Sequence, residues 1–219
     1  MANTLLIIGE SGVGKSHSLQ NLNPEETLII APNSKPLPWQ GSGKTFVDGK
    51  NVIRITELKQ VPMLVDKAAQ GSKFKTVIIE DFTHLLNQRM MDPSFANSTS
   101  WSKWNHMASD AYQALLAKHE TYRKDLNIVV IAHSDVKENG AIGMRTSGKL
   151  LDNTIDIVSY FTVVLHARIL RGDSGLRYVF QTHNDGQYIC KSPVGMFQDD
   201  FVANDLQQVL TNITNYYNA

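Results

Sequence analysis

Residues 4–16 read TLLIIGESGVGKS, and this stretch decides the fold. From Gly9 to Ser16 it matches the motif G-x-x-x-x-G-K-[ST] in full, and the apolar run Leu5–Ile8 precedes it. The motif needs a strand before it and a helix after it. We expect a strand over the apolar run and a helix from Gly14 to about Leu22. The stretch therefore predicts a phosphate-binding P-loop in an α/β fold.

The spacing of the motif follows from the shape of a polyphosphate. Glycines allow the backbone to wrap the ligand, so that its N–H groups approach the phosphate oxygens. Lys15 would reach the β and γ oxygens, and the Ser16 hydroxyl would ligate Mg²⁺. We expect nine consecutive residues to hold the nucleotide: Gly9, Glu10, Ser11, Gly12, Val13, Gly14, Lys15, Ser16 and His17.

Composition narrows the class of protein. The chain has 219 residues, of which 42% are hydrophobic and 19% are charged, and this fits one domain with one substantial core. Because 21 basic residues balance 21 acidic ones, nucleic-acid binding would need a local basic patch. The single cysteine, Cys190, favours a buried thiol in a reducing compartment. With no apolar run of about 18 residues and no signal-peptide pattern, we expect a cytoplasmic protein without a membrane partner.

The next segments continue an α/β pattern. Thr27–Ala31 and Asn51–Thr56 read as strands, and a helix is expected over Glu57–Ala69. Buried strands without polar alternation imply helices on both faces of the sheet. Between the two strands lies a long loop that contains a second near-match, Gly41–Thr45 (GSGKT). No strand precedes it and the first glycine of the motif is missing, so we expect a surface loop.

Lys75–Asp81, KTVIIED, predicts a third buried strand with two carboxylates at its end. This is the form of a Walker B segment, in which one carboxylate holds Mg²⁺ and a neighbour polarises the attacking water. We expect Asp81 and Ser16 to be the metal ligands. Strand alternation would point Glu80 and Asp81 to opposite faces.

Asn87–Met107 reads as the least regular part of the chain. It combines Arg89, Trp101 and Lys103 with small polar residues, a mixture of cations and aromatic faces that suits stacking of unpaired bases. The alternative is that Trp101 and Trp104 anchor the following helix.

Asn127–Ala132 predicts a fourth buried strand, which ends at His133. The loop over residues 134–151 follows it and combines glycines with spaced cations. The cations are Lys137, Arg145 and Lys149. Such a loop suits a segment that orders on a phosphate backbone. The alternative is an ordinary solvated loop.

The pattern then changes to that of an antiparallel meander. Ser159–Leu170, Arg177–Thr182 and Gln187–Lys191 read as strands joined by glycine-containing hairpin turns. An amphipathic helix is expected over about residues 203–217.

This ordered series resembles the RecA-like ATPase core. More narrowly, it resembles the minimal RecA-like ATPases of bacteriophages, which are linked to single-strand annealing and recombination. The likeness covers residues 3–197; the P-loop and Walker B carry its specificity, and Gln181–Phe197 is similar to the end of that core. It implies one RecA-like P-loop NTPase domain over residues 1–219, with a mostly parallel sheet flanked by helices and a C-terminal antiparallel meander.

The resemblance also implies partners and site residues. It implies an ATPase that uses ATP and Mg²⁺ and is stimulated by DNA, with single-stranded DNA, further copies in a ring or filament, and a single-strand DNA-binding protein as partners. In that fold His133 would sit between Asp81 and Lys15 and sense the γ-phosphate; the alternative is a strand-end histidine without a role. Lys191 falls where a lysine could act on the neighbouring subunit's nucleotide.

One departure from the RecA pattern bears on catalysis. RecA proteins carry a catalytic glutamate just after the second strand, where this chain offers Asn33, and an asparagine cannot act as a base. Either Glu80 takes the role, or hydrolysis is slow, or the protein is a nucleotide-gated scaffold. A P-loop kinase of small molecules is a further alternative, for which only the loop at Arg145 could form a lid.

Overall fold

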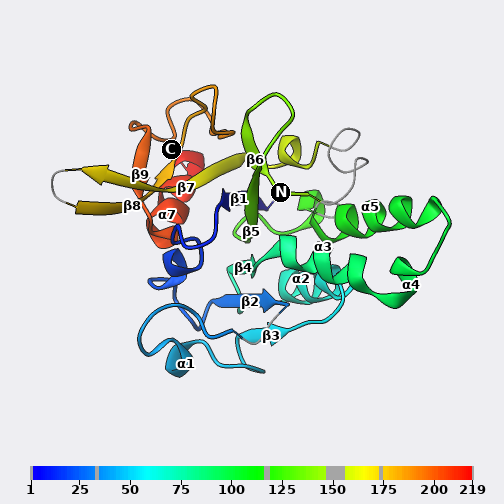
Figure 1. Ribbon diagram of the computed structural model, residues 1–219. Coiled ribbons are helices and arrows are strands. Elements are labelled where there is room, and N and C mark those ends of the chain that lie inside the picture. The colour runs from blue at the N-terminus through cyan, green and yellow to red at the C-terminus, as the bar shows by residue number, and fades with distance from the viewer. Residues whose placement is uncertain (1, 33–34, 116–118, 147–155, 173–174, 219) are drawn as a thin grey trace.

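The computed structural model describes residues 2–32, 35–115, 119–146, 156–172 and 175–218. Among these residues, nine strands form one mixed sheet in the order β3-β2-β4-β5-β1-β7-β8-β9, with β6 paired to β5 (Figure 1). The strands are β1 (Asn3–Gly9), β2 (Thr27–Ala31), β3 (Val52–Arg54), β4 (Thr76–Ile79), β5 (Asn127–Val136), β6 (Ile142–Met144), β7 (Val163–Gly172), β8 (Gly175–Gln181) and β9 (Phe201–Ala203). From β3 to β7 neighbours pair in parallel, and β7, β8 and β9 pair antiparallel. The predicted mostly parallel sheet with an antiparallel end is confirmed.

Helices cover both faces of the sheet, as the unbroken apolar strands predict. The helices are α1 (Ser42–Thr45), α2 (Gln60–Gln70), α3 (Phe82–Met91), α4 (Pro93–Ala96), α5 (Ser102–Leu115) and α7 (Leu206–Asn218), with 3₁₀ turns η1 (Ser16–Leu19), η2 (His119–Thr121) and η3 (Ile157–Tyr160). Leu6 and Ile8 of β1 share a buried cluster with α2, α3 and α5, whereas Leu5 and Ile7 share another with η1 and α7. Figure 1 shows α2, α3 and α5 gathered on one side and the red α7 on the other. Alternate residues of one apolar strand therefore supply two cores.

The helix after the P-loop is shorter than predicted. It is a single 3₁₀ turn, η1, rather than a helix to Leu22. Ser18 donates its hydroxyl hydrogen bond to the Lys15 carbonyl (2.6 Å), and Leu22 N–H donates to the Leu19 carbonyl in the tighter i to i−3 pattern. These bonds replace those of a longer α-helix.

The prediction of an irregular segment over residues 87–107 is wrong, because α3, α4 and α5 take up most of it. Asp92 caps α4 by accepting a hydrogen bond from Ser94 N–H, and Pro93 follows at the first helical position. Phe95 is buried and meets Trp104 edge to face, with ring centroids 5.1 Å apart. Tertiary packing of these aromatic rings thus overrides the weak helix propensity of the serines and asparagines.

The antiparallel end also differs from the prediction in its third strand. Residues 187–191 make only isolated bridges, and β9 takes the expected place beside β8. Asp185 explains the difference, because its carboxylate accepts the backbone N–H groups of Gln187 and Tyr188 (2.9 and 2.7 Å). Those donors are used in a local turn instead of a ladder.

The single cysteine, the C-terminal helix, the GSGKT segment and the apolar runs were also the subject of predictions. Cys190 is buried, and burial raises the pKa of its thiol to about 12. The C-terminal helix is present as α7, and α1 is a single helical turn in the GSGKT segment that is exposed except at Ser42. In the part of the chain that the structure describes, no helix has the length and apolar character to cross a bilayer.

Candidate nucleotide-binding site

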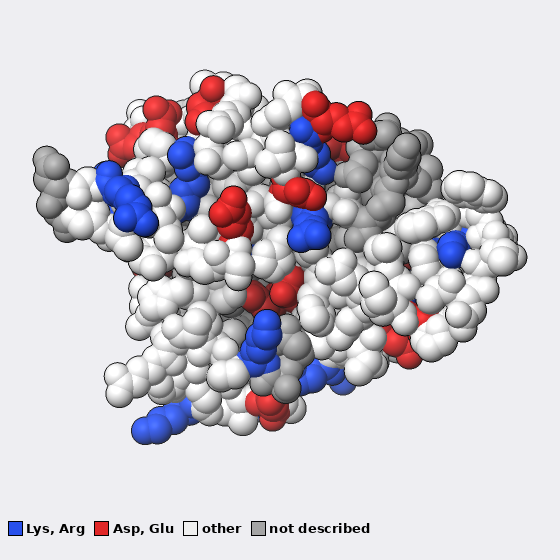
Figure 2. Space-filling view, viewed as in Figure 1, with Lys and Arg blue, Asp and Glu red and all other residues white. Residues whose placement is uncertain are grey.

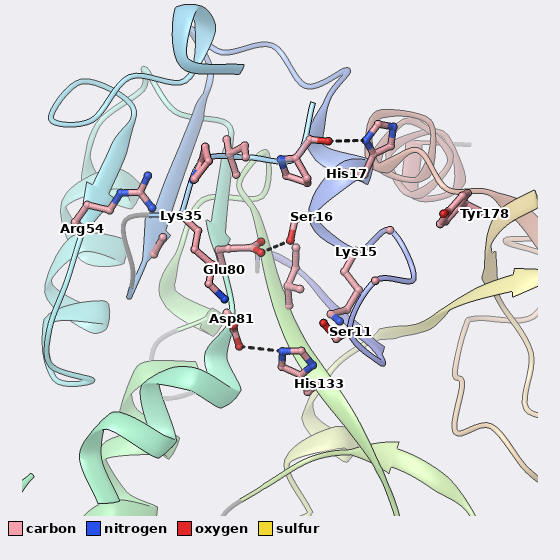
Figure 3. A pocket seen from close by; sticks show the side chains of 17 residues that line it. Ser11, Lys15, Ser16, His17, Lys35, Arg54, Glu80, Asp81, His133 and Tyr178 are labelled. Carbon is pink, nitrogen blue, oxygen red and sulfur yellow. Dashed lines mark hydrogen bonds and ion pairs between the residues drawn. The ribbon is translucent and has the colours of Figure 1, made fainter. Parts of the chain in front are cut away.

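The carboxyl ends of the parallel strands meet at a cavity of about 530 Å³. The P-loop lines one wall, and Glu80, Asp81 and His133 line the middle (Figure 3). Because β5 lies between β4 and β1, His133 comes between the acidic pair and the P-loop, and this predicted strand order is confirmed. Ligands of open α/β sheets bind in such a crevice.

Glycines shape the P-loop at two kinds of position. Gly12 and Gly14 have φ values of 83° and 92°, in the left-handed region that side chains disfavour. At Gly9 the constraint is contact, since an added Cβ would lie 2.9 Å from the Ala167 carbonyl oxygen. The loop therefore turns toward the cavity while packing tightly on β7.

Lys15 braces the loop from inside. Its Nζ donates hydrogen bonds to the carbonyl oxygens of Gly9 (2.8 Å) and Glu10 (2.6 Å), and the residue is only 8% exposed. Burial lowers the pKa of Lys15, although the charges of Glu80 and Asp81 oppose this shift. The buried ammonium group of Lys15 has lost its contacts with water, and the oxygens of a bound phosphate would replace them.

Ser16 meets Glu80 rather than Asp81. Its Oγ donates a hydrogen bond to Glu80 Oε1 (2.5 Å), while Oε2 is buried without a hydrogen-bond partner among the described residues. Burial, reinforced by the charge of Asp81, raises the pKa of Glu80 to about 7. The hydrogen bond from Ser16 acts in the opposite direction and lowers this pKa, but its effect is smaller. A buried carboxylate oxygen without a partner needs a cation or a proton.

Ser16 and Glu80 therefore fit a Mg²⁺ site. Mg²⁺ takes one or two protein ligands and completes its octahedron with waters and substrate phosphates. The described residues contain no group of three or more His, Cys, Asp or Glu side chains that could hold a metal.

Asp81 faces the same cavity because it leaves the strand conformation. Its φ of 53° makes it the one described non-glycine residue with positive φ, and its Oδ1 caps α3 by accepting from His84 N–H (3.1 Å). The expectation that Glu80 and Asp81 point to opposite faces is wrong for this reason. Non-glycine residues are uncommon in this region, and Asp is one of the few types that adopt it readily.

His133 pairs with Asp81. Its Nε2 lies 3.6 Å from Asp81 Oδ1, and its backbone N–H donates to Thr83 Oγ1 (2.9 Å). Burial would raise the pKa of Asp81, but the bond and charge of His133, aided by His84, hold it below its ordinary value. Asp81 is thus an anion beside a histidine. The sequence paired Ser16 with Asp81, whereas the structure pairs Ser16 with Glu80 and Asp81 with His133.

Glu80 makes the stability of the protein depend on pH. Its pKa of about 7, against an ordinary 4.5, means that the fold favours the protonated form, so the stabilisation is full below pH 4.5 and is lost as the pH rises through 7. Gln cannot ionise, and the Glu80→Gln variant should therefore match the wild type near pH 4 and exceed it by roughly 3 kcal/mol near pH 8. Urea unfolding without nucleotide at both pH values measures the difference. An equal difference at both would contradict this origin.

Other predicted nucleotide contacts divide into two groups. Ser11, Gly12, Gly14 and His17 line the cavity, and His17 Nδ1 lies 3.3 Å from the Pro38 carbonyl oxygen. Three predicted residues do not line it: Gly9, Glu10 and Val13. The first two act through the carbonyls that hold Lys15, and Val13 packs against the core.

Among the lining residues with charged or polar side chains, the sequence analysis missed three: Lys35, Arg54 and Tyr178. They come from the loop after β2, from β3 and from β8. No local motif marks them, because the sheet order alone brings those segments to the cavity.

Two DNA-binding candidates hold helices together. Arg89 lies 3.6 Å from Asp110 in an ion pair, and Lys103 donates to the Ser98 carbonyl (2.8 Å). Trp101, by contrast, is 85% exposed at the start of α5. On the face seen in Figure 2, basic side chains are scattered among acidic ones.

The segment after His133 begins as a β-hairpin instead of a loop. β5 continues to Val136 and pairs with β6, and Arg145 N–H donates to the His133 carbonyl (2.7 Å). The Arg145 side chain lies 4.0 Å from Asp135, and Lys137 stands at the hairpin turn. Lys149 and Asn33 lie outside the described residues.

Lys191 does not line the cavity of its own chain. Its Nζ donates to the Ser159 carbonyl (2.9 Å), and its backbone bridges Val164. A trans-acting role for Lys191 stays a prediction.

The comparison with known families agrees with this geometry. A family described as AAA domain has a sequence model that matches residues 1–194. No curated protein matches the sequence.

Proposed function

The chain belongs to the AAA domain family of P-loop ATPases, and from this premise we propose that it hydrolyses Mg²⁺-ATP in response to single-stranded DNA and promotes annealing or strand exchange. One observation carries the ATPase part of the proposal: a single cavity combines Lys15, the Ser16–Glu80 pair and the Asp81–His133 pair. The DNA part rests on the resemblance to minimal RecA-like ATPases of bacteriophages.

Lys15 and Asp81 divide the chemistry of hydrolysis. Lys15 neutralises charge on the β and γ oxygens, and Asp81 orients the attacking water and accepts its proton. The water oxygen bonds to the γ-phosphorus while the bond to the β–γ bridging oxygen breaks, and ADP and phosphate leave. Ser16 and Glu80 would hold Mg²⁺, which neutralises charge on the same oxygens when bound.

His133 connects the reaction to the hairpin behind it. Its side chain faces Asp81, and its carbonyl accepts the Arg145 N–H at the base of the β5–β6 hairpin. A change at the γ-phosphate that moves His133 would therefore move Arg145, and a strand bound there would act back on Asp81. This coupling supports hydrolysis that responds to DNA.

The decisive measurement is the ATPase rate with and without single-stranded DNA at low salt. We expect DNA to raise the wild-type rate severalfold. Arg145→Gln should leave the basal rate within twofold and lower the stimulation, because one phosphate contact is lost; the salt slope of binding should fall by about 0.7. Lys50→Gln, which removes an exposed cation paired with Glu25, is the matched control.

Two results would overturn parts of this proposal. If the protein bound no single-stranded DNA with ATP and Mg²⁺ at low salt, the DNA role would be lost. If it bound ATP tightly without turnover even with DNA present, it would be a nucleotide-gated scaffold.

We also propose that copies of the chain assemble as a ring or filament on DNA, and that a single-strand DNA-binding protein acts with them. Light scattering on addition of ATP and single-stranded DNA tests assembly. An unchanged mass under those conditions would count against it.

A further inference from the structure

The cavity reaches past the P-loop on the side away from the acidic pair. In the sheet, β4 lies two strands from β1 on one side, and β8 lies two strands from β1 on the other, which is roughly 10 Å in each direction. Tyr178 of β8 lines the cavity, and it is the only described residue of β7, β8 or β9 that does so. Figure 3 shows Tyr178 on one side of Lys15, with Glu80 and Asp81 on the other.

A nucleotide held for hydrolysis would run through this cavity in one direction. In the proposed reaction the γ-phosphate lies beside Asp81, which accepts the proton of the attacking water, and Lys15 contacts the β and γ oxygens. The α-phosphate, the ribose and the base therefore continue away from Asp81. They lead toward the end of the cavity that Tyr178 lines.

Tyr178 is fixed in position while its side chain stays accessible. Its backbone pairs with Ile169 of β7, and its carbonyl accepts the Asn204 N–H (3.3 Å) on the β9 side. The ring packs against the P-loop, because a Cβ added at Gly14 would lie 3.0 Å from Tyr178 Cδ1. Tyr178 is nevertheless 47% exposed. An aromatic ring that a strand holds beside a cavity provides a rigid platform for a flat ligand.

We propose that Tyr178 stacks on the base of the nucleotide whose phosphates the P-loop holds. This inference rests on the proposed function, since it takes a nucleoside triphosphate as the ligand of the P-loop. Every base has a π face that an aromatic ring can cover, so stacking adds affinity without reading the edge of the base. Lys15 and Ser16 bind the phosphate end of the ligand, and Tyr178 binds its other end.

The test compares Mg²⁺-ADP with Mg²⁺-pyrophosphate, which has two phosphates but no base. In calorimetry on the full chain, Tyr178→Ala should weaken ADP binding about fivefold to 150-fold, as expected for the loss of stacking between a base and an aromatic ring. The same variant should bind pyrophosphate within twofold of the wild type. Tyr178→Phe, which keeps the ring, should bind both ligands like the wild type.

Leu176→Ala is the matched control. Leu176 lies two residues before Tyr178 on the same face of β8 and is 53% exposed, but it does not line the cavity. Its affinities for ADP and pyrophosphate should both equal those of the wild type. Tyr178→Val also lacks the ring and suits a strand, so it keeps the test valid if Tyr178→Ala disturbs β8.

The contrary results have separate meanings. If loss of the ring weakened ADP and pyrophosphate binding equally, Tyr178 would only brace the P-loop at Gly14, and if it weakened neither, the base would lie elsewhere; both results overturn the stacking. If the wild type bound neither ADP nor pyrophosphate, the proposed function itself would be lost.

A second comparison changes only the base. UDP has the phosphates and ribose of ADP but a smaller ring, so stacking should make the wild type bind ADP more tightly than UDP. Tyr178→Ala should reduce this preference. An unchanged ratio of the two affinities would show that the preference has another origin and would overturn the stacking on Tyr178.

Discussion

The Lys15→Ala variant is expected to hydrolyse ATP with kcat/KM lowered about 10³-fold. The substitution removes a buried ammonium that offsets Glu80 and Asp81 and that would meet the charge developing on the γ-phosphate. It also leaves the Gly9 and Glu10 carbonyls without the donor that braces the loop. Steady-state phosphate release measures the rate, and a melting temperature close to that of the wild type would show that the fold is kept.

The chain contains its own control for this prediction. Lys44 lies in the GSGKT segment, which is similar in sequence to the end of the P-loop but forms a helical turn that does not line the cavity, and Lys44 itself is exposed. Lys44→Ala should keep the wild-type rate. A Lys15→Ala variant that retained more than a tenth of the wild-type kcat/KM would contradict the role of Lys15.

The Asp81→Asn variant is expected to lose about 10²- to 10⁴-fold in kcat while its affinity for ATP changes less than threefold. The change removes the proton acceptor beside the attacking water and leaves the P-loop intact. Asn tolerates the left-handed backbone at φ 53° and can still accept the His84 N–H that caps α3, so the variant should fold. Single-turnover rates with equilibrium nucleotide binding separate the two effects.

Asp92→Asn is the matched substitution. Asp92 also caps a helix, by accepting the Ser94 N–H (2.8 Å), but it does not line the cavity. Its rate should equal that of the wild type. If Asp81→Asn kept at least half of the wild-type kcat while Glu80→Gln abolished turnover, the base would be Glu80 and the present assignment of Asp81 would be wrong.

The P-loop and the acidic strand end could be predicted because their chemistry depends on local spacing. Gly12 and Gly14 take left-handed φ values, which favour glycine, so this backbone requirement is visible in the sequence as a residue type. The apolar run before Glu80 forms the strand β4 that it predicts. The predictions for residues 87–107 and 187–191 were wrong because they considered only the intrinsic preferences of each segment. There, packing of Phe95 in one segment and the carboxylate of Asp185 in the other outweighed intrinsic preference.

By itself the sequence determined that this protein has a P-loop, buried apolar strands that alternate with helices, and two carboxylates at a strand end, since all three are properties of consecutive residues. Only the tertiary structure decided which carboxylate meets Ser16. The reason is the left-handed backbone at Asp81, which places both carboxylates in one cavity. Glu80 there accepts a hydrogen bond from Ser16, and Asp81 pairs with His133. Lys35 and Arg54 likewise joined the cavity only through the order of the strands, which no run of neighbouring residues encodes.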